Sequence, residues 1–139
     1  MTPEQKTLVV NTWKAVEPIA DTAATLFYNR LFELDPSLRS LFKPDLGEQK
    51  RKLMQTIGFA VSSLGNLETL VPVVQQLGKR HAGYHVKDKD YATVGAALLW
   101  TLEQGLGPAF TPEVKAAWTE VYTVLSNTMM AAAKEAAPA

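Results

Sequence analysis

The chain contains no cysteine. A disulfide framework, a zinc–thiolate site, an iron–sulfur cluster and a cysteine nucleophile are therefore excluded. With 139 residues, the chain has the size of one domain and is long enough to bury a core without such supports. The absence of cysteine also fits a reducing compartment.

An excess of charge of one sign and long apolar runs are missing as well. The 14 basic residues balance the 14 acidic ones, and the longest basic cluster is Lys50-Arg51-Lys52. We therefore expect no nucleic-acid partner. No apolar run reaches the roughly 18 residues that a membrane helix needs, and the first residues lack the apolar core of a signal peptide. The sequence predicts a cytoplasmic protein with no membrane partner.

Sustained strand alternation is absent too, and apolar residues recur with helical spacing almost throughout the chain. Thr2 and Gln5 have the spacing of a capping box, which indicates the start of a first helix. A second helix should end before Pro36, because the residue preceding a proline disfavours helical dihedral angles. Its apolar face includes Ile19 and Leu34.

These patterns together predict an all-α fold of six to eight helices, too irregular in length for a simple four-helix bundle. No linker or repeat divides residues 1–139, so we expect a single domain. Residues 131–139 form a low-complexity, alanine-rich tail that we expect to fray.

One of the chain's two histidines ends a long apolar stripe. The stripe follows a single helix face and consists of Leu67, Leu70, Val71, Val74, Leu77, Gly78 and His81. Pro72 fits this helix if it lies in the first turn, where amides have no partner within the helix. A histidine at the end of a buried face is either a core residue with a satisfied hydrogen bond or a ligand of a metal or cofactor.

Motifs of common enzymes are missing. The chain has no glycine-rich phosphate loop, no G-x-S-x-G and no H-E-x-x-H sequence. His81 and His85 are spaced to share one helix face, but a zinc site in a protein needs at least a third ligand, and none stands nearby in the sequence. A zinc site is therefore poorly supported.

Four other side chains are candidates for a binding site, although each has an ordinary explanation. Gln49 heads an apolar helix face and is typical of an exposed first-turn residue. Tyr28 lies beside the main stripe of its helix, as a boundary tyrosine with its hydroxyl in water does. Phe42 precedes a Lys-Pro break and Tyr91 opens a helix, so both fit core residues.

The order of these features resembles the globin family. The resemblance covers residues 2–130 and depends on the apolar helices, Trp13, Pro36, Phe42, Leu77-Gly78-Lys79-Arg80-His81 and Trp118. The chain is similar to single-domain bacterial globins, and residues 51–54 and 106–118 are also similar to vertebrate neuroglobin.

The resemblance implies a haem cofactor, iron protoporphyrin IX. His81 stands at the position of the family's iron-binding histidine, and its second ring nitrogen needs an acceptor, most simply the Leu77 carbonyl one turn back. Phe42 matches the family's aromatic residue that packs on the haem. The apolar walls expected from the resemblance are Leu53, Ile57, Leu77, Val86, Val94 and Leu98.

On the opposite face of the haem, Tyr28 and Gln49 match the two positions that face a bound gas. This pair resembles that of bacterial flavohaemoglobins. Glutamine is a poor iron ligand compared with imidazole, so the resemblance implies five-coordinate ferrous iron that is open to O2. The Tyr28 O–H and Gln49 N–H groups are then expected to donate hydrogen bonds to the gas, which takes partial negative charge.

The resemblance also suggests how the rest of the cofactor is held. Lys52, Arg80 and His85 are candidates to neutralise the haem carboxylates, although His85 fits an exposed histidine equally well. Tyr91 stands where flavohaemoglobins have a tyrosine that supports the iron-binding histidine. Ala133 occupies the place of the accompanying glutamate, so a strong anionic push on the iron is in doubt.

Two functions follow from the resemblance as expectations. The first is reversible binding of O2 or another diatomic gas, for transport or storage. The second is nitric oxide dioxygenase activity, which converts NO to nitrate and needs a separate reductase, since the chain holds no flavin domain. A gas sensor and a haem-free helical interaction module remain further alternatives.

Overall fold

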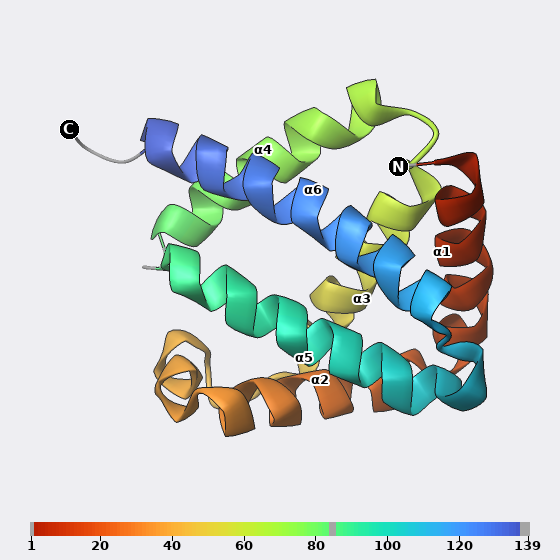
Figure 1. Ribbon diagram of the computed structural model, residues 1–139. Helices are drawn as coiled ribbons and strands as arrows, with labels where there is room; N and C mark the ends of the chain where they lie inside the picture. Colours follow the sequence, from red (N-terminus) through yellow and green to blue (C-terminus); the bar gives the residue numbers. More distant parts are fainter. Residues whose placement is uncertain (1, 84–85, 137–139) are drawn as a thin grey trace.

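Helices make up the fold in the computed structural model, which describes residues 2–83 and 86–136 (Figure 1). Within these ranges there are six α-helices, three short 3-10 helices and no strand, which confirms the predicted all-α class. In chain order the elements are α1 (Pro3–Val16), η1 (Glu17–Ile19), α2 (Ala20–Leu34), η2 (Pro36–Leu41), α3 (Gly47–Ser62), α4 (Leu67–Gly83), α5 (Asp88–Leu106), η3 (Gly107–Ala109) and α6 (Pro112–Ala136).

Local sequence signals set several of these boundaries. The Thr2 hydroxyl accepts the Gln5 amide at 3.1 Å, while the Gln5 side chain accepts the Thr2 amide at 3.0 Å, which completes the predicted capping box. Helix α2 ends at Leu34, before Pro36 as expected. Helix α5 ends at Leu106 and is followed by Gly107, whose φ of 55° is a conformation that glycine adopts without strain.

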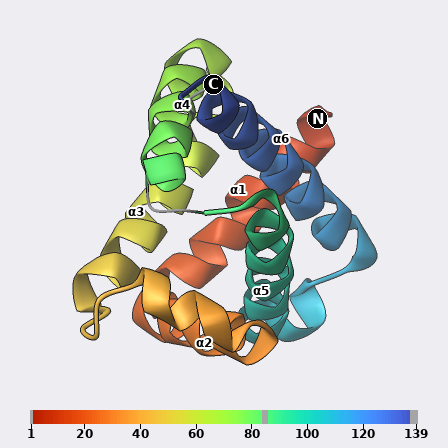
Figure 2. The ribbon, with the colours of Figure 1, turned by 90° about the vertical axis from the view of Figure 1, so that its left-hand side faces the viewer.

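The helices pack as crossed pairs rather than as a parallel bundle. Helix α6 lies mainly against α4 and also against α1, while α2 lies against α5 and α3 (Figures 1 and 2). Helix α6 runs back in roughly the opposite direction to α5 after the short η3 connection (Figure 1). In the view of Figure 2, α3 and α4 lie on the left and α5 and α6 lie on the right.

The main core joins the first helix to the last. Its largest members are Trp13 on α1 and Trp118 on α6, whose ring centroids are 6.2 Å apart. The indole N–H of Trp118 donates to the Thr12 hydroxyl at 2.9 Å, which satisfies the polar atom of this buried ring. A second cluster around Phe27 and Tyr28 fills the space between α2, η2 and α5.

Three expectations from the sequence need correction. Ile19 and Leu34 are 39% and 43% exposed, so the predicted apolar face is covered only in part, and Ile19 lies in η1 because α2 begins at Ala20. Pro72 lies inside α4 rather than in its first turn, so its nitrogen cannot donate to the Glu68 carbonyl. The tail expected to fray from residue 131 remains helical as far as Ala136.

No helix in the described ranges is long and apolar enough to cross a membrane.

Candidate functional site

The imidazole of His81 is held in a defined orientation near the end of α4. Its Nδ1 lies 2.8 Å from the Leu77 carbonyl oxygen, the acceptor predicted from the sequence. Since a carbonyl can only accept, Nδ1 carries the proton in this contact and Nε2 carries the lone pair. Burial lowers the pKa of His81, and the charge of Arg80 lowers it further, while the bond to Leu77 acts in the opposite direction.

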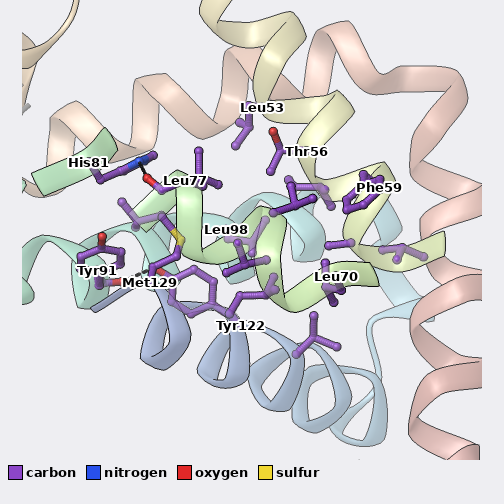
Figure 3. A pocket seen from close by; sticks show the side chains of 18 of the residues that line it. Leu53, Thr56, Phe59, Leu70, Leu77, His81, Tyr91, Leu98, Tyr122 and Met129 are labelled. Carbon is purple, nitrogen blue, oxygen red and sulfur yellow. Dashed lines mark hydrogen bonds between the residues drawn. The ribbon is translucent and has the colours of Figure 1, made fainter. Parts of the chain in front are cut away.

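An apolar cavity of about 180 Å³ lies beside His81 (Figure 3). Helices α3, α4, α5 and α6 contribute most of its wall. Of the residues predicted to surround a cofactor, the cavity is lined by Leu53, Ile57, Leu77, His81, Val86, Tyr91, Val94 and Leu98. The structure therefore brings together side chains that stand up to 45 positions apart in the sequence (Leu53 to Leu98).

A second cavity of about 280 Å³ adjoins the first, since both are lined by His81 and Val86. Its wall is far more polar. It is lined by Leu41, Phe42, Lys43, Asp45, Glu48, Gln49, Lys52, His81 and Val86. His81 thus borders an apolar cavity and a charged one.

Tyr28 and Gln49 meet near this polar end. Tyr28 is only 3% exposed, and its ring packs edge-on against Phe42 with centroids 5.6 Å apart. Burial raises the pKa of Tyr28 to about 12, and a hydrogen bond with the Gln49 side chain partly opposes that rise. The phenol therefore keeps its proton at neutral pH. Gln49 itself is exposed and lines the second cavity, whereas Tyr28 lies behind Phe42.

Tyr91 is also close to His81, with ring centroids 6.5 Å apart. Burial raises the pKa of Tyr91, and the nearby carboxylates of Asp88 and Asp90 raise it further. Its hydroxyl is buried without a hydrogen-bond partner among the described residues. The hydroxyl of Tyr122 on α6 donates to the Tyr91 carbonyl at 2.6 Å, which ties the start of α5 to α6.

Gly78 allows α4 to approach α6 closely, one turn before His81. A Cβ added at Gly78 would lie 2.4 Å from the Met129 carbonyl oxygen and 2.7 Å from the Met129 Cα. These are backbone atoms, so they cannot move aside as the end of a side chain does. The glycine therefore helps to set the distance between α6 and the helix that carries His81.

The remaining predicted residues are placed less centrally. Lys52 lines the second cavity but is exposed and forms an ion pair with Glu48 at 3.3 Å. Arg80 is exposed and lines neither cavity. His85 lies outside the described residues. Ala133, at the position where the resemblance expects a glutamate, supplies no carboxylate.

Sequence reasoning missed part of the cavity wall. Thr56, Phe59, Val73, Tyr122 and Met129 all line the apolar cavity. Nothing in the sequence context of Tyr122 indicated its bond to the Tyr91 carbonyl. Thr56, Phe59 and Val73 are exposed, so their positions on a helix wheel give no sign that they border a cavity.

The chemistry of the donor set defines a class of protein. In the described ranges no three His, Cys, Asp or Glu side chains gather as a metal site would require. These residues therefore offer too few ligands for a bare metal ion. One imidazole beside an apolar space instead suits a flat prosthetic group that brings its own equatorial ligands. In the second cavity Lys43 and Lys52 fit the carboxylates of such a group, while Asp45 and Glu48 stand beside them. The residues present therefore fit a haem held through one histidine.

Comparison with known proteins specifies the family. The chain belongs to the globin family, whose sequence model, described as Globin, matches residues 25–129. Neuroglobin of Danio rerio is 31% identical over 93% of this chain and 90% of its own length, and neuroglobin-1 of Oncorhynchus mykiss gives the same values. Among solved structures, a bacterial globin from Campylobacter jejuni shares the fold, with a TM-score of 0.86 at 24% identity over 96% of this chain and 97% of its own. Globins hold haem and bind gases there, and this chain shares that general function.

Proposed function

We propose that this protein reversibly binds O2 or another diatomic gas at a haem whose iron is held by His81. The observation that carries the proposal is the position of His81 on the wall of an apolar cavity, with Nδ1 bonded to the Leu77 carbonyl at 2.8 Å. That bond selects the tautomer in which Nε2 can act as a metal ligand, and it orients the ring. Haem would supply the iron on which the gas is held.

The residues of the two cavities suit the two parts of a haem. Leu53, Ile57 and Leu98 offer an apolar surface for the macrocycle. Lys43 and Lys52 line the charged cavity and would face the carboxylates. Arg80, predicted for the same role, stands outside both cavities, so we assign the stronger contribution to the two lysines.

Tyr28 and Gln49 would act on the gas side. The Tyr28 phenol remains protonated because burial raises its pKa to about 12, so it can donate a hydrogen bond. Gln49 hydrogen-bonds with Tyr28 and can hold its hydroxyl in place. Donors directed at a ligand that takes negative charge make stronger hydrogen bonds than neutral pairs do. We therefore expect Tyr28 to slow the release of O2.

Nitric oxide dioxygenase activity is the second candidate, favoured by the contact between Tyr28 and Gln49. It would require an external reductase. Nitrate formation from NO in the presence of O2 and a reductase would support this activity. A rate of nitrate formation no higher than that of free haem would count against it.

The test of the main proposal uses the absorption spectrum of the purified protein. Haem-loaded protein should show a Soret band, and His81→Gly should lose it or bind haem weakly. Added imidazole should restore the band in His81→Gly by filling the space left by the ring. A haem spectrum in His81→Gly that is identical to the parent without imidazole would overturn the assignment of His81.

Replacement of Tyr28 by phenylalanine tests the gas side separately. Tyr28→Phe removes one hydroxyl and keeps the ring that packs on Phe42. We expect O2 to dissociate faster, as measured by stopped-flow mixing of the oxygenated protein with excess CO. An unchanged dissociation rate would refute the role of Tyr28 but leave that of His81 intact.

A further inference from the structure

Arg39 lies near the end of η2 and bonds to the loop of residues 42–46, which leads from η2 to α3. Nη1 of its guanidinium donates to the Lys43 carbonyl at 3.0 Å and, over a longer 3.4 Å, to the Phe42 carbonyl. Nη2 donates to the Pro44 carbonyl at 2.9 Å. One half-buried side chain therefore binds three consecutive carbonyls of the loop, and we call this set of contacts the Arg39 clamp.

Within the described residues, the middle of this loop has little other support. At its start the Phe42 amide donates to the Arg39 carbonyl at 3.2 Å, and at its end the Asp45 carboxylate accepts the Gly47 amide at 2.9 Å. Between these two bonds, no backbone–backbone hydrogen bond joins residues 43–45 to another part of the chain that the structure describes. A loop of this kind opens easily unless side chains hold it. The Arg39 clamp therefore supplies the contacts that hold the middle of the loop to η2.

The loop carries two side chains that border the proposed haem site. Lys43 and Phe42 both line the charged cavity, and the Phe42 ring packs on Tyr28 with centroids 5.6 Å apart. The Arg39 guanidinium also lies over the Phe32 ring, 5.4 Å from its centroid, and this stacking is a favourable cation–π contact. Phe32 in turn packs on Phe42 with centroids 5.7 Å apart. Arg39 therefore holds Phe42 in two ways, through its carbonyl and through the ring on which it packs.

We propose that Arg39 is a positioning residue for the gas side of the haem site: the Arg39 clamp fixes Phe42, and Phe42 fixes the direction in which the Tyr28 hydroxyl donates. The effect on the gas rests on the proposed function, whereas the clamp depends only on the contacts above. A hydrogen bond weakens steeply when it is misaligned, so a small shift of the phenol would weaken its bond to the gas. Arg39 itself lines neither cavity, and it acts only through Phe42 and Tyr28.

The release of O2 from haem-loaded protein tests this role in a double-mutant cycle. Arg39→Ala should speed O2 dissociation by about two- to fivefold, in the lower part of the couplings found between residues of one network. In a Tyr28→Phe background, Arg39→Ala should have no further effect, because the donor that it positions is gone. The proposal is overturned if Tyr28→Phe speeds release and Arg39→Ala does not, or if Arg39→Ala speeds release equally in both backgrounds.

Arg30 provides the matched control. Its guanidinium also stacks on an aromatic ring, 5.2 Å from the Trp100 centroid, but its hydrogen bond goes to Glu33 rather than to the loop. Arg30→Ala should therefore leave O2 dissociation unchanged, and an increase equal to that in Arg39→Ala would overturn the proposal.

A conservative variant guards against loss of the fold. Arg39→Lys keeps the positive charge but lacks the planar fork that binds several carbonyls at once, so its O2 dissociation rate should lie between those of the parent and Arg39→Ala. If circular dichroism shows that Arg39→Ala is unfolded, Arg39→Lys takes its place in the cycle. A rate in Arg39→Lys equal to that of the parent would then overturn the proposal.

A measurement without gas separates the clamp from the proposed function. Burial raises the pKa of Tyr28 to about 12, and a loosened loop would let water reach the phenol, so this pKa should fall in Arg39→Ala and stay unchanged in Arg30→Ala. The ring resonances of 13C-labelled Tyr28 report the change, because at about pH 11 the phenol should be largely protonated in the parent and more ionised in Arg39→Ala. Identical resonances in the two proteins would overturn the clamp, whether or not the chain binds haem. If Tyr28→Phe leaves O2 release unchanged, the proposed function fails at Tyr28, and a lowered pKa in Arg39→Ala would still support the clamp.

Discussion

Replacing Gly78 with alanine tests how α6 positions the helix that carries His81. In an ordinary helix interior this change stabilises a protein by about 0.5–1 kcal/mol, because glycine loses more backbone entropy on folding. At Gly78 the new methyl group would lie 2.4 Å from the Met129 carbonyl oxygen, well inside van der Waals contact. Backbone atoms of α6 must move, so the sign of the effect should reverse.

The magnitude follows from these two opposing contributions. Overpacking of a core costs about 1–3 kcal/mol, and the three atoms of Met129 within 3 Å place Gly78 toward the upper part of that range. After subtraction of the helix-propensity gain, we expect the free energy of unfolding to fall by about 1–2 kcal/mol. Displacement of α4 should also loosen the contact between His81 and its cofactor, which would speed haem release.

Guanidinium unfolding followed by circular dichroism measures the first effect, and transfer of haem to an excess of an acceptor protein measures the second. Gly58 provides the matched control, since it also lies inside a helix but its added Cβ would meet only the Trp13 ring at 3.6 Å. Gly58→Ala should be neutral or stabilising. If Gly78→Ala proved as stable as Gly58→Ala, the close approach of α4 and α6 would not control the position of His81.

Three further predictions concern other parts of the fold. Gly95→Ala would bring a methyl group to 2.8 Å from the Tyr122 ring. The ring is anchored by its bond to the Tyr91 carbonyl, but it can shift more readily than the backbone at Met129. The loss of unfolding free energy should therefore be smaller than in Gly78→Ala, and an equal or larger loss would contradict this. Folding raises the pKa of Tyr28 from 10.0 to about 12, so the unfolded chain loses its phenolic proton first as pH rises. The free energy of unfolding should therefore fall between those two pH values by up to about 3 kcal/mol. In urea unfolding, Tyr28→Phe should show a shallower decline above pH 10, and an identical decline would be evidence against the shift. Arg39→Ala removes hydrogen bonds to the carbonyls of residues 43 and 44 at 3.0 and 2.9 Å, which should lower the free energy of unfolding by about 1–2 kcal/mol. Arg30→Ala should cost less, because the Arg30 guanidinium stacks on the Trp100 ring without binding a loop. Thermal melts that rank the two variants in reverse would refute this.

The parts of the fold that depend on neighbours in sequence could be predicted. The capping box at Thr2 and the end of α2 before Pro36 each depend on residues a few positions apart. The bond between His81 and the Leu77 carbonyl is equally local, because residues four apart lie one above the other on a helix. For the same reason the apolar stripe of α4 could be identified without knowledge of its partner helix.

Features that depend on how helices approach each other could not be predicted from periodicity. Nothing near Gly78 in the sequence indicates that Met129, on a helix that begins more than thirty residues later, passes against it. The exposure of Leu34 at the end of α2 depends on how far neighbouring elements cover that helix, which a single-helix pattern does not contain. The contact between Tyr28 and Gln49 also joins different helices, and it was expected only because the chain resembles globins.

Helix α6 thus has a larger part in the site than its few lining residues suggest. Its backbone at Met129 limits the position of α4 through Gly78, and its Tyr122 hydroxyl holds the start of α5 at the Tyr91 carbonyl. Helix α6 therefore contacts both α4, which carries His81, and the start of α5, which carries Tyr91. Through these two contacts α6 acts on the position of the imidazole indirectly. The same helix also lines the apolar cavity through Trp118, Val121 and Leu125, so changes in its packing should alter cofactor retention as well.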